Sequence, residues 1–323
     1  MDESIHDAKE ANSTKLIEHL NKEGINKPID LVYTWVDGND LEYQKLVNKY
    51  SEKPLDLNPE RYRDLFELMK YSLRSVEKFA PWINHIYIFT CRPQKPDWLN
   101  VDHPKISVVH HDEVFDEQDV PTFNYNVIES YIHKIPGLSD DFIYLNDDFL
   151  FGNEVHPQDF YTKDGKVLIH GTLFGENLGW RIYNKKNDIV GLGLIEHSPL
   201  LIRKEWWQGM QDSRPELIDE IKSHKFREGT DVMTYKLYRW YALKHQSEHC
   251  RAIKLPELLK IHSFHKITNN LKKQQRAFQW LEKKQPKFYC LNDDQGETPN
   301  MEVVQIVREF LANYYPESSR FEI

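Results

Sequence analysis

Two adjacent carboxylates, Asp147 and Asp148, end a short apolar and aromatic run that begins at Phe142. Such a run is typical of a buried strand. Neighbouring ionised carboxylates repel each other, and burying either one is costly unless a positive charge lies between them. With Asn146 they offer the oxygen ligands that Mg²⁺ or Mn²⁺ prefers, and such a metal suits a nucleotide diphosphate. The alternative is a solvated turn or a cap of the next element.

A second run of the same kind spans residues 288–291 and ends on Asn292, Asp293 and Asp294. Asp293 could complete a metal site with the first carboxylate pair. The alternative is that it starts a turn before the next glycine.

The exit of the first expected strand carries Trp35, Asp37, Gly38 and Asp40. Gly38 permits a tight turn or a close approach of the backbone to a ligand. Taken alone, this pattern favours a turn followed by a helix start. Its position after a strand makes ligand contact a second interpretation.

His197 precedes Ser198 and Pro199 at the start of an expected helical segment. The ordinary pKa of histidine lies near neutrality, so a histidine at such a boundary could act as a general base or a nucleophile. The chain has 15 histidines, and any one of them taken alone is more often structural.

Several arginines flank the first strand-helix-strand unit, and their guanidinium groups are suited to bidentate phosphate contacts. Most helix arginines are solvated or ion-paired, so each of these taken alone favours a structural role. The arginines are Arg61, Arg63, Arg74 and Arg92.

Strands alternate with helices in the first half of the chain, which predicts parallel β-α-β units. Ligands bind such open sheets at the carboxyl ends of the strands, where the acidic triplet and the turn after Val36 would lie. We expect strands at 29–36, 86–90, 106–109, 142–145 and 166–169, and helices at 63–79 and 123–134. The rest is expected to be mainly helical, with helices at 199–210, 214–223, 231–244, 265–284 and 300–314. The prediction is an α/β fold with a mostly parallel sheet and a helical C-terminal portion, made of a helical extension (1–27) and one catalytic domain (28–323).

Composition narrows the class of protein. The length of 323 residues allows one large domain or two modest ones, and a net charge of -9 argues against a nucleic-acid binder. No run is long and apolar enough to cross a membrane, and the acidic start does not resemble a signal peptide, so we expect a cytoplasmic protein. The three cysteines, Cys91, Cys250 and Cys290, form neither a disulfide framework nor a zinc pattern.

These segments, in this order, resemble the Stealth family of sugar-phosphate transferases, which includes bacterial capsular polysaccharide phosphotransferases and the catalytic part of the animal N-acetylglucosamine-1-phosphotransferase. The chain's length favours the bacterial type. The resemblance covers nearly everything after Pro28. It is carried by residues 29–40, 61–64, 71–83, 121–124, 142–148 and 287–293, and more loosely by 197–199 and 227–231.

The resemblance implies a glycosyltransferase-A-like, nucleotide-sugar-binding domain. It implies transfer of a hexose or N-acetylhexosamine 1-phosphate, with UDP the expected carrier, to a hydroxyl of an oligosaccharide or polysaccharide acceptor in capsule or exopolysaccharide synthesis. Peripheral association with membrane-bound capsule machinery is also implied.

The same resemblance implies roles for individual residues. The metal ligands would be Asp147, Asp148 and Asp293. The catalytic residues would be His197, Asp37 and Arg227, with Arg227 also a candidate phosphate contact. The donor-binding residues would be Trp35, Gly38, Asp40, Arg63, Arg74, Arg181 and Asn146.

Two rival functions remain as alternatives. A metal-dependent glycosyltransferase would break the bond at the anomeric carbon and release a nucleoside diphosphate. A non-catalytic carbohydrate-binding protein is suggested by the 8 Trp and 17 Tyr residues, although aromatic residues more often belong to the core.

Overall fold

The structure is a computed structural model that describes residues 27–51, 64–171, 182–184, 189–191, 197–296 and 298–323. The helix expected within residues 1–27 therefore lies outside the described residues, apart from Lys27. Among the described residues, no helix is both long enough and apolar enough to span a membrane.

The central sheet has five strands in the order β3-β2-β1-β4-β9. The first four strands are parallel, and β9 runs antiparallel to β4. Thr34 at the end of β1 pairs with Asn146 at the end of β4, so both strands deliver their following residues to the same edge of the sheet. The strands are β1 (Ile29–Thr34), β2 (Ile86–Thr90), β3 (Ile106–His110), β4 (Asp141–Asn146) and β9 (Leu200–Arg203).

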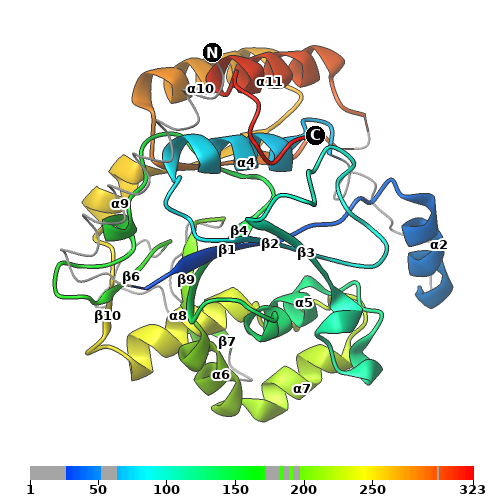
Figure 1. Cartoon of the computed structure of the whole chain (residues 1–323), viewed down its shortest axis with the longest axis vertical. Coiled ribbons are helices and arrows are strands. Elements are labelled where there is room, and N and C mark those ends of the chain that lie inside the picture. Colours follow the sequence, from blue (N-terminus) through cyan, green and yellow to red (C-terminus); the bar gives the residue numbers. More distant parts are fainter. Residues whose placement is uncertain (1–26, 52–63, 172–181, 185–188, 192–196, 297) are drawn as a thin grey trace.

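Helices cover both faces of this sheet (Figure 1). On one side lies α4 (Leu68–Phe79), which buries Met69, Leu73 and Val76 against the strands. On the other side lie α5, α6, α7 and α8. A parallel sheet covered on both faces has strands that are mainly apolar and buried along nearly their whole length, as β1, β2 and β4 are. The helices of the second side are α5 (Tyr125–Tyr131), α6 (Lys204–Asp212), α7 (Pro215–Ser223) and α8 (Thr234–His245).

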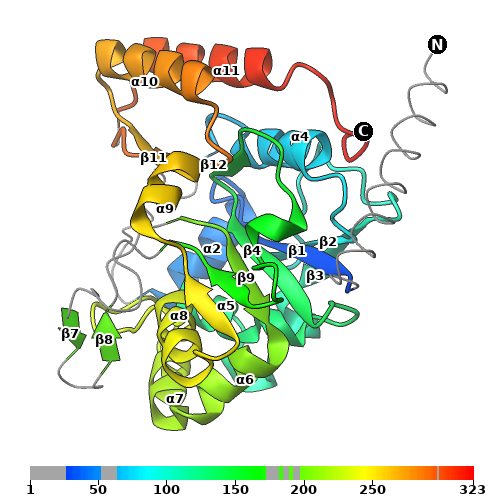
Figure 2. The same ribbon diagram turned by 90° about the vertical axis from the view of Figure 1, so that its left-hand side faces the viewer.

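A second sheet has the strand order β11-β12-β5. Its strands are β11 (His262–Ile267), β12 (Phe288–Asp293) and β5 (Phe149–Phe151). The helices α10 (Leu271–Lys284) and α11 (Met301–Tyr314) form the outer layer beyond this sheet and α4 (Figure 2). A separate apolar cluster, which includes Leu150, Leu291 and the stacked pair Phe278 and Phe310, packs between them. Only Asp147 and Asp148 separate β4 of the first sheet from β5 of the second.

The remaining elements are short. They are α2 (Leu41–Tyr50), α9 (Leu255–Ile261), β6 (Val167–Ile169), β7 (Ile182–Asn184), β8 (Ile189–Gly191) and β10 (Cys250–Ala252), with 3-10 turns at His111–Glu113, Glu117–Asp119, Ile132–Lys134 and Pro157–Asp159.

The predicted α/β fold with a mostly parallel sheet is confirmed, but the C-terminal portion holds more strands than expected. Residues 200–203 form the edge strand β9 and not the start of a helix, because a short apolar run fits a buried strand as well as a buried helix. Residues 265–267 end strand β11, so the following helix begins at Leu271. The helix predicted from residue 63 begins at Leu68, because residues 64–67 form a bend before it.

Candidate active site at the junction of the two sheets

A cavity of about 610 Å³ opens at the carboxyl ends of β1 and β4. Five carboxylates line it, together with two arginines, His197 and several aromatic side chains. Ligand cavities of this size and position are usual in open α/β sheets. The charged residues of its wall are Asp64, Glu129, Asp147, Asp148, Asp293, Arg227 and Arg239.

The pairing of β5 with β12 brings the second acidic cluster to the first. Phe149 pairs with Cys290 in antiparallel register, and the backbone N–H of Leu291 donates to the carbonyl of Asp148 at 3.0 Å. Continuing that register places Asn292 and Asp293 beside the β4–β5 junction. Asp293 thus lines the same cavity as Asp147 and Asp148, and its role as a third metal ligand stays a prediction.

Asp148 holds His197 in a fixed orientation. Nδ1 of His197 donates to Oδ1 of Asp148 at 2.9 Å, and Oδ2 accepts from Nδ2 of Asn292 and from the thiol of Cys290, both at 3.2 Å. Burial alone would raise the pKa of Asp148. The neighbouring His197 charge and these hydrogen bonds outweigh burial and lower the pKa below its usual value. The arrangement makes Nε2 the ring nitrogen that can exchange a proton with a ligand.

The backbone of His197 is in the left-handed region, with φ of 52°. A non-glycine residue there is uncommon and carries a cost of about 1–3 kcal/mol, and such residues cluster at functional sites. This conformation occurs three residues before β9 begins, with the imidazole hydrogen-bonded to Asp148.

Among the carboxylates of the site, Asp147 is the one whose ionised form is least favourable. Burial raises its pKa to about 7, and the nearby charges of Asp148 and Asp64 contribute to that rise. A cation beside this carboxylate would offset both effects. The surrounding oxygen donors, from Asn146, Asp148 and Asp293, belong to the hard class that Mg²⁺ and Mn²⁺ prefer.

Cys290 also lies in this cluster, where ligand atoms of Asp148, His197 and Cys290 approach within 4.8 Å of one another. Burial, followed by the charge of Asp148, raises the pKa of the Cys290 thiol well above its ordinary value. Because metals bind the thiolate, the protonated thiol is a poor ligand. The residues therefore fit a hard divalent cation held by carboxylates better than a thiolate-bound metal.

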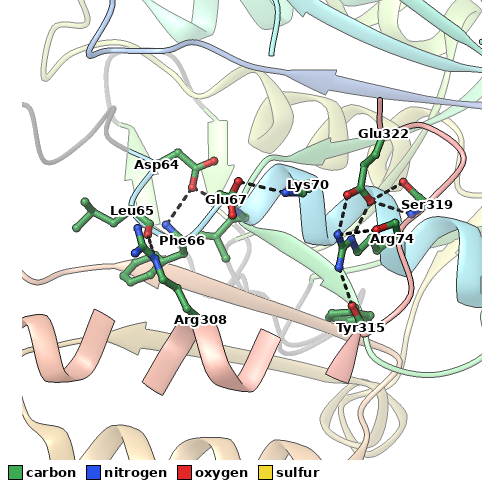
Figure 3. Close-up of polar contacts among 12 residues, drawn as sticks. Asp64, Leu65, Phe66, Glu67, Lys70, Arg74, Arg308, Tyr315, Ser319 and Glu322 are labelled. Atoms are coloured by element: carbon green, nitrogen blue, oxygen red, sulfur yellow. Dashed lines mark hydrogen bonds and ion pairs between the residues drawn. The ribbon is translucent and has the colours of Figure 1, made fainter. Parts of the chain in front are cut away.

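Asp64 is a cavity residue that sequence reasoning left without a role. Its Oδ1 accepts from the backbone N–H groups of Phe66 at 3.3 Å and Leu68 at 3.0 Å, which anchors the start of α4 (Figure 3). Burial raises its pKa. The sequence did contain a signal for Asp64, because this residue belongs to the segment 61–64 that carries the family resemblance. The periodic pattern of apolar residues did not distinguish it.

Arg74 does not lie at the cavity, which corrects its expected role in donor binding. Its Nε and Nη2 donate to the two carboxylate oxygens of Glu322 at 2.8 and 2.7 Å, and Nη1 donates to the carbonyl of Tyr315 at 3.0 Å (Figure 3). The fork-shaped group is thus occupied by the C-terminal segment, and Arg74 joins that segment to α4. Arg92 has a similar role at the surface, where it pairs with Asp112 and Glu113.

Asp37, Gly38 and Asp40 also require correction, because none of them lines the cavity. Oδ1 of Asp37 accepts from the backbone N–H of Asn39 at 2.9 Å, and Oδ1 of Asp40 caps α2 by accepting from the backbone N–H of Tyr43 at 2.6 Å. The segment is the turn and helix start that its composition favoured.

The other residues predicted for the site either line the cavity or lie outside the described residues. Trp35, Asn146 and Arg227 do line the cavity, with the Arg227 guanidinium 5.3 Å from the centre of the Tyr125 ring. Arg61, Arg63 and Arg181 lie outside the described residues. Sequence reasoning also missed Glu129 and Arg239, because a single charged residue on a helix gives no sign that it is buried.

Fold and site together define an α/β protein with a carboxylate- and histidine-lined ligand cavity at the carboxyl edge of its sheet. The chain belongs to the Stealth family. Family models match residues 27–54 (Stealth protein CR1, conserved region 1), 61–169 (CR2, conserved region 2) and 280–323 (CR4, conserved region 4). These matches include every strand of the central sheet except β9.

Curated relatives of the chain carry phosphotransferase names. An exopolysaccharide phosphotransferase of Streptomyces coelicolor is 31% identical over 93% of this chain and 53% of its own length. The capsular polysaccharide phosphotransferase LcbA of Neisseria meningitidis is 34% identical over 63% of this chain and 61% of the relative. The capsular polysaccharide phosphotransferase WcwK of Streptococcus pneumoniae is 28% identical over 91% of this chain and 98% of the relative. The chain thus spans about half of the first relative's length, and 23% and 33% of two further Streptomyces coelicolor relatives.

Among solved structures, the galactosyltransferase LgtC, crystallised with donor and acceptor sugar analogues, has a TM-score of 0.47 and 10% identity to this chain. That likeness covers 88% of this chain and 96% of LgtC.

Proposed function

We propose that the chain transfers a sugar 1-phosphate from a nucleotide sugar, with UDP the expected carrier, to a hydroxyl group of an acceptor sugar. The product is a phosphodiester linkage of a capsular polysaccharide or exopolysaccharide. The observation that carries the proposal is the Asp148–His197 pair in a cavity rich in carboxylates. The phosphotransferase names of the relatives support the reaction type.

In the proposed reaction, the acceptor hydroxyl oxygen attacks the β-phosphorus of the donor. A new P–O bond forms to the acceptor, the bond between the β-phosphorus and the bridging oxygen breaks, and nucleoside monophosphate leaves. Nε2 of His197 takes the hydroxyl proton, while Asp148 holds the imidazole and stabilises the imidazolium that results. A covalent route, with Nε2 as the attacking atom, uses the same pair and is distinguished by a trapped phosphohistidine.

Asp147, Asp148, Asp293 and Asn146 would hold a divalent cation at this site. Such a cation neutralises negative charge on a diphosphate during transfer. Arg227, which also lines the cavity, is the proposed phosphate contact, and Trp35 is a proposed donor contact beside β1.

The acceptor in this proposal is an oligosaccharide or polysaccharide. We also propose a cytoplasmic location, because activated sugars are made in the cytoplasm, and peripheral association with membrane-bound capsule machinery, where such a polysaccharide would be assembled.

One assay separates the proposal from its rivals. The full chain is incubated with a panel of nucleotide sugars, Mg²⁺ and oligosaccharide acceptors, and the released nucleotide is identified. Nucleoside monophosphate is the expected product. Nucleoside diphosphate would show that the chain is a glycosyltransferase. No nucleotide release with any donor, together with sugar binding, would favour a carbohydrate-binding protein.

A further inference from the structure

Arg239 is a buried guanidinium in the wall of the cavity. The side chain comes from α8, is only 2% exposed and lines the cavity. Nε donates to the carbonyl of His170 at 3.0 Å, and Nη2 donates to Oγ of Ser198 at 2.9 Å. Nη1 is also buried, and it has no hydrogen-bond partner among the described residues. The group is thus held rigidly by two of its nitrogens while the third has unused hydrogen-bonding capacity.

The Arg239 guanidinium lies 5.2 Å from the centre of the Tyr235 ring, but it has no hydrogen-bonded carboxylate among the described residues. Two other arginines of the described residues, Arg74 and Arg203, each donate to a carboxylate, from Glu322 and Asp141. No such ion pair is present for Arg239 in the parts of the chain that the structure describes. Burial lowers its pKa to about 10, so the group stays cationic at neutral pH.

Glu129 is the carboxylate whose charge acts on Arg239, and it compensates that charge only in part. Burial raises the pKa of Glu129 to about 7, so a fraction of this carboxyl is protonated near neutral pH. A buried donor left unsatisfied is destabilising, and more so when it is charged. An anionic oxygen beside Nη1 would satisfy both the donor and the charge.

The neighbours of Arg239 indicate which anion would bind to it. Ser198, which accepts from Nη2, directly follows His197, and His197 is bonded to Asp148. The guanidinium is therefore hydrogen-bonded to the residue that follows the proposed base, and both Arg239 and His197 line the same cavity.

We propose that Arg239 contacts a non-bridging oxygen of the phosphoryl group that is transferred, through Nη1. The proposal rests on the proposed function and deepens it by naming a phosphate-binding residue of that site. A water molecule bridging Arg239 and Glu129 is the competing explanation.

The test is a calorimetric titration of the full chain with inorganic pyrophosphate and Mg²⁺, because this probe carries the phosphate chemistry without a sugar or base. Arg239→Gln is expected to weaken binding about 10- to 100-fold, which is the size of one charge-assisted hydrogen bond. Arg239→Lys should fall between that variant and the unmodified chain, since it keeps charge without the fork. Arg203→Gln is the matched control: it removes a partly buried arginine outside the cavity, and its binding should match that of the unmodified chain.

Pyrophosphate binding within about twofold of the unmodified chain in a folded Arg239→Gln variant would overturn the proposal. If that variant does not fold, a crystal structure of the unmodified chain with pyrophosphate decides the question. A phosphate oxygen within about 3.2 Å of Nη1 supports the contact, and a water molecule there overturns it. An unmodified chain that binds no pyrophosphate would contradict the proposed function itself, whereas equal binding by the unmodified and variant chains would contradict only the role of Arg239.

Discussion

Nδ1 of His197 lies 2.9 Å from Oδ1 of Asp148, although 49 positions separate the two residues in the chain. Asp148 stands at the junction of the two sheets, and His197 lies three residues before the start of the edge strand β9 at Leu200. Their hydrogen bond therefore joins the second sheet to the edge of the first. It also fixes the tautomer of the imidazole, so the contact that joins the two sheets leaves Nε2 as the ring nitrogen available for chemistry.

Loss of either member of this pair should suppress turnover. We expect His197→Ala to lower the rate on the order of 10²–10⁴-fold, because the acceptor proton then has no positioned base. Asp148→Asn should produce a loss of similar size, since the amide can neither hold the tautomer nor stabilise the imidazolium. The measurement is initial-rate release of nucleoside monophosphate.

The double variant and a control complete that experiment. Residues that act as a unit are not additive, so the double variant should lose little more than the worse single variant. Asp294→Asn, which neutralises an exposed carboxylate beside the cavity residue Asp293, should keep near-normal rates. Two large and fully additive losses would argue that His197 and Asp148 act separately.

Much of this site could be predicted from the sequence, because short apolar runs indicate which segments form buried strands and where those strands end. The apolar runs that form β1, β2 and β4 are buried on both faces, and parallel connections force their ends to one edge. That reasoning placed Asp147 and Asp148. The convergence of Asp293 depends on the long-range register of β5 with β12, which no local pattern encodes.

The errors have physical causes as well. Arg74 has the chemistry of a phosphate ligand, but its partner Glu322 lies 248 positions away and cannot be inferred from spacing. Asp37 and Asp40 follow a ligand-edge strand, yet their carboxylates satisfy backbone donors of the turn and of α2. Arg239 was missed for the opposite reason. Its burial arises from packing of α8 against the cavity wall, and a charged residue on a helix is ordinarily solvated.

Arg74 should matter for stability and not for donor binding. We expect Arg74→Ala to lower the free energy of unfolding by about 1–3 kcal/mol, because it leaves Glu322 and the Tyr315 carbonyl without their partner. Pyrophosphate affinity should be unchanged. Urea unfolding and the same calorimetric titration measure the two quantities. Weaker pyrophosphate binding in a variant of normal stability would restore Arg74 to the donor site.

Glu129 should make stability fall as pH rises. Burial raises its folded-state pKa to about 7, above the unfolded value near 4.5, so the native chain binds more protons between these limits. The stabilisation is complete below the unfolded-state pKa and is lost as pH rises through the folded-state pKa. Its size is on the order of 3 kcal/mol, because a tenfold change in a proton-binding constant corresponds to about 1.36 kcal/mol.

Urea unfolding at about pH 5 and about pH 8, on either side of the folded-state pKa, measures this contribution through a substitution. Glu129→Gln should remove part of the pH dependence, because glutamine keeps an oxygen to accept from the Tyr144 hydroxyl and does not titrate. Glu216→Gln, at an exposed position of α7, should leave the dependence unchanged. An identical pH slope in the Glu129→Gln variant and the unmodified chain would mean that the pKa of Glu129 is not strongly raised.

The Asp147 carboxylate is expected to destabilise the metal-free chain and to contribute to stability when a divalent cation is bound. An ordinary structural residue would stabilise the chain in both conditions. Without metal, Asp147→Asn should melt at the same temperature as the unmodified chain or higher, because the substitution removes repulsion with Asp148 and Asp64. With Mg²⁺ or Mn²⁺ at about 100 times the dissociation constant, the unmodified chain should gain about 2.7 kcal/mol, and the variant should gain much less. Thermal melts with EDTA and with added metal measure both effects, and Asp294→Asn should respond to metal as the unmodified chain does. If Asp147→Asn melts lower in EDTA and keeps the full metal response, the carboxylate supports the turn between β4 and β5 and is not a metal ligand.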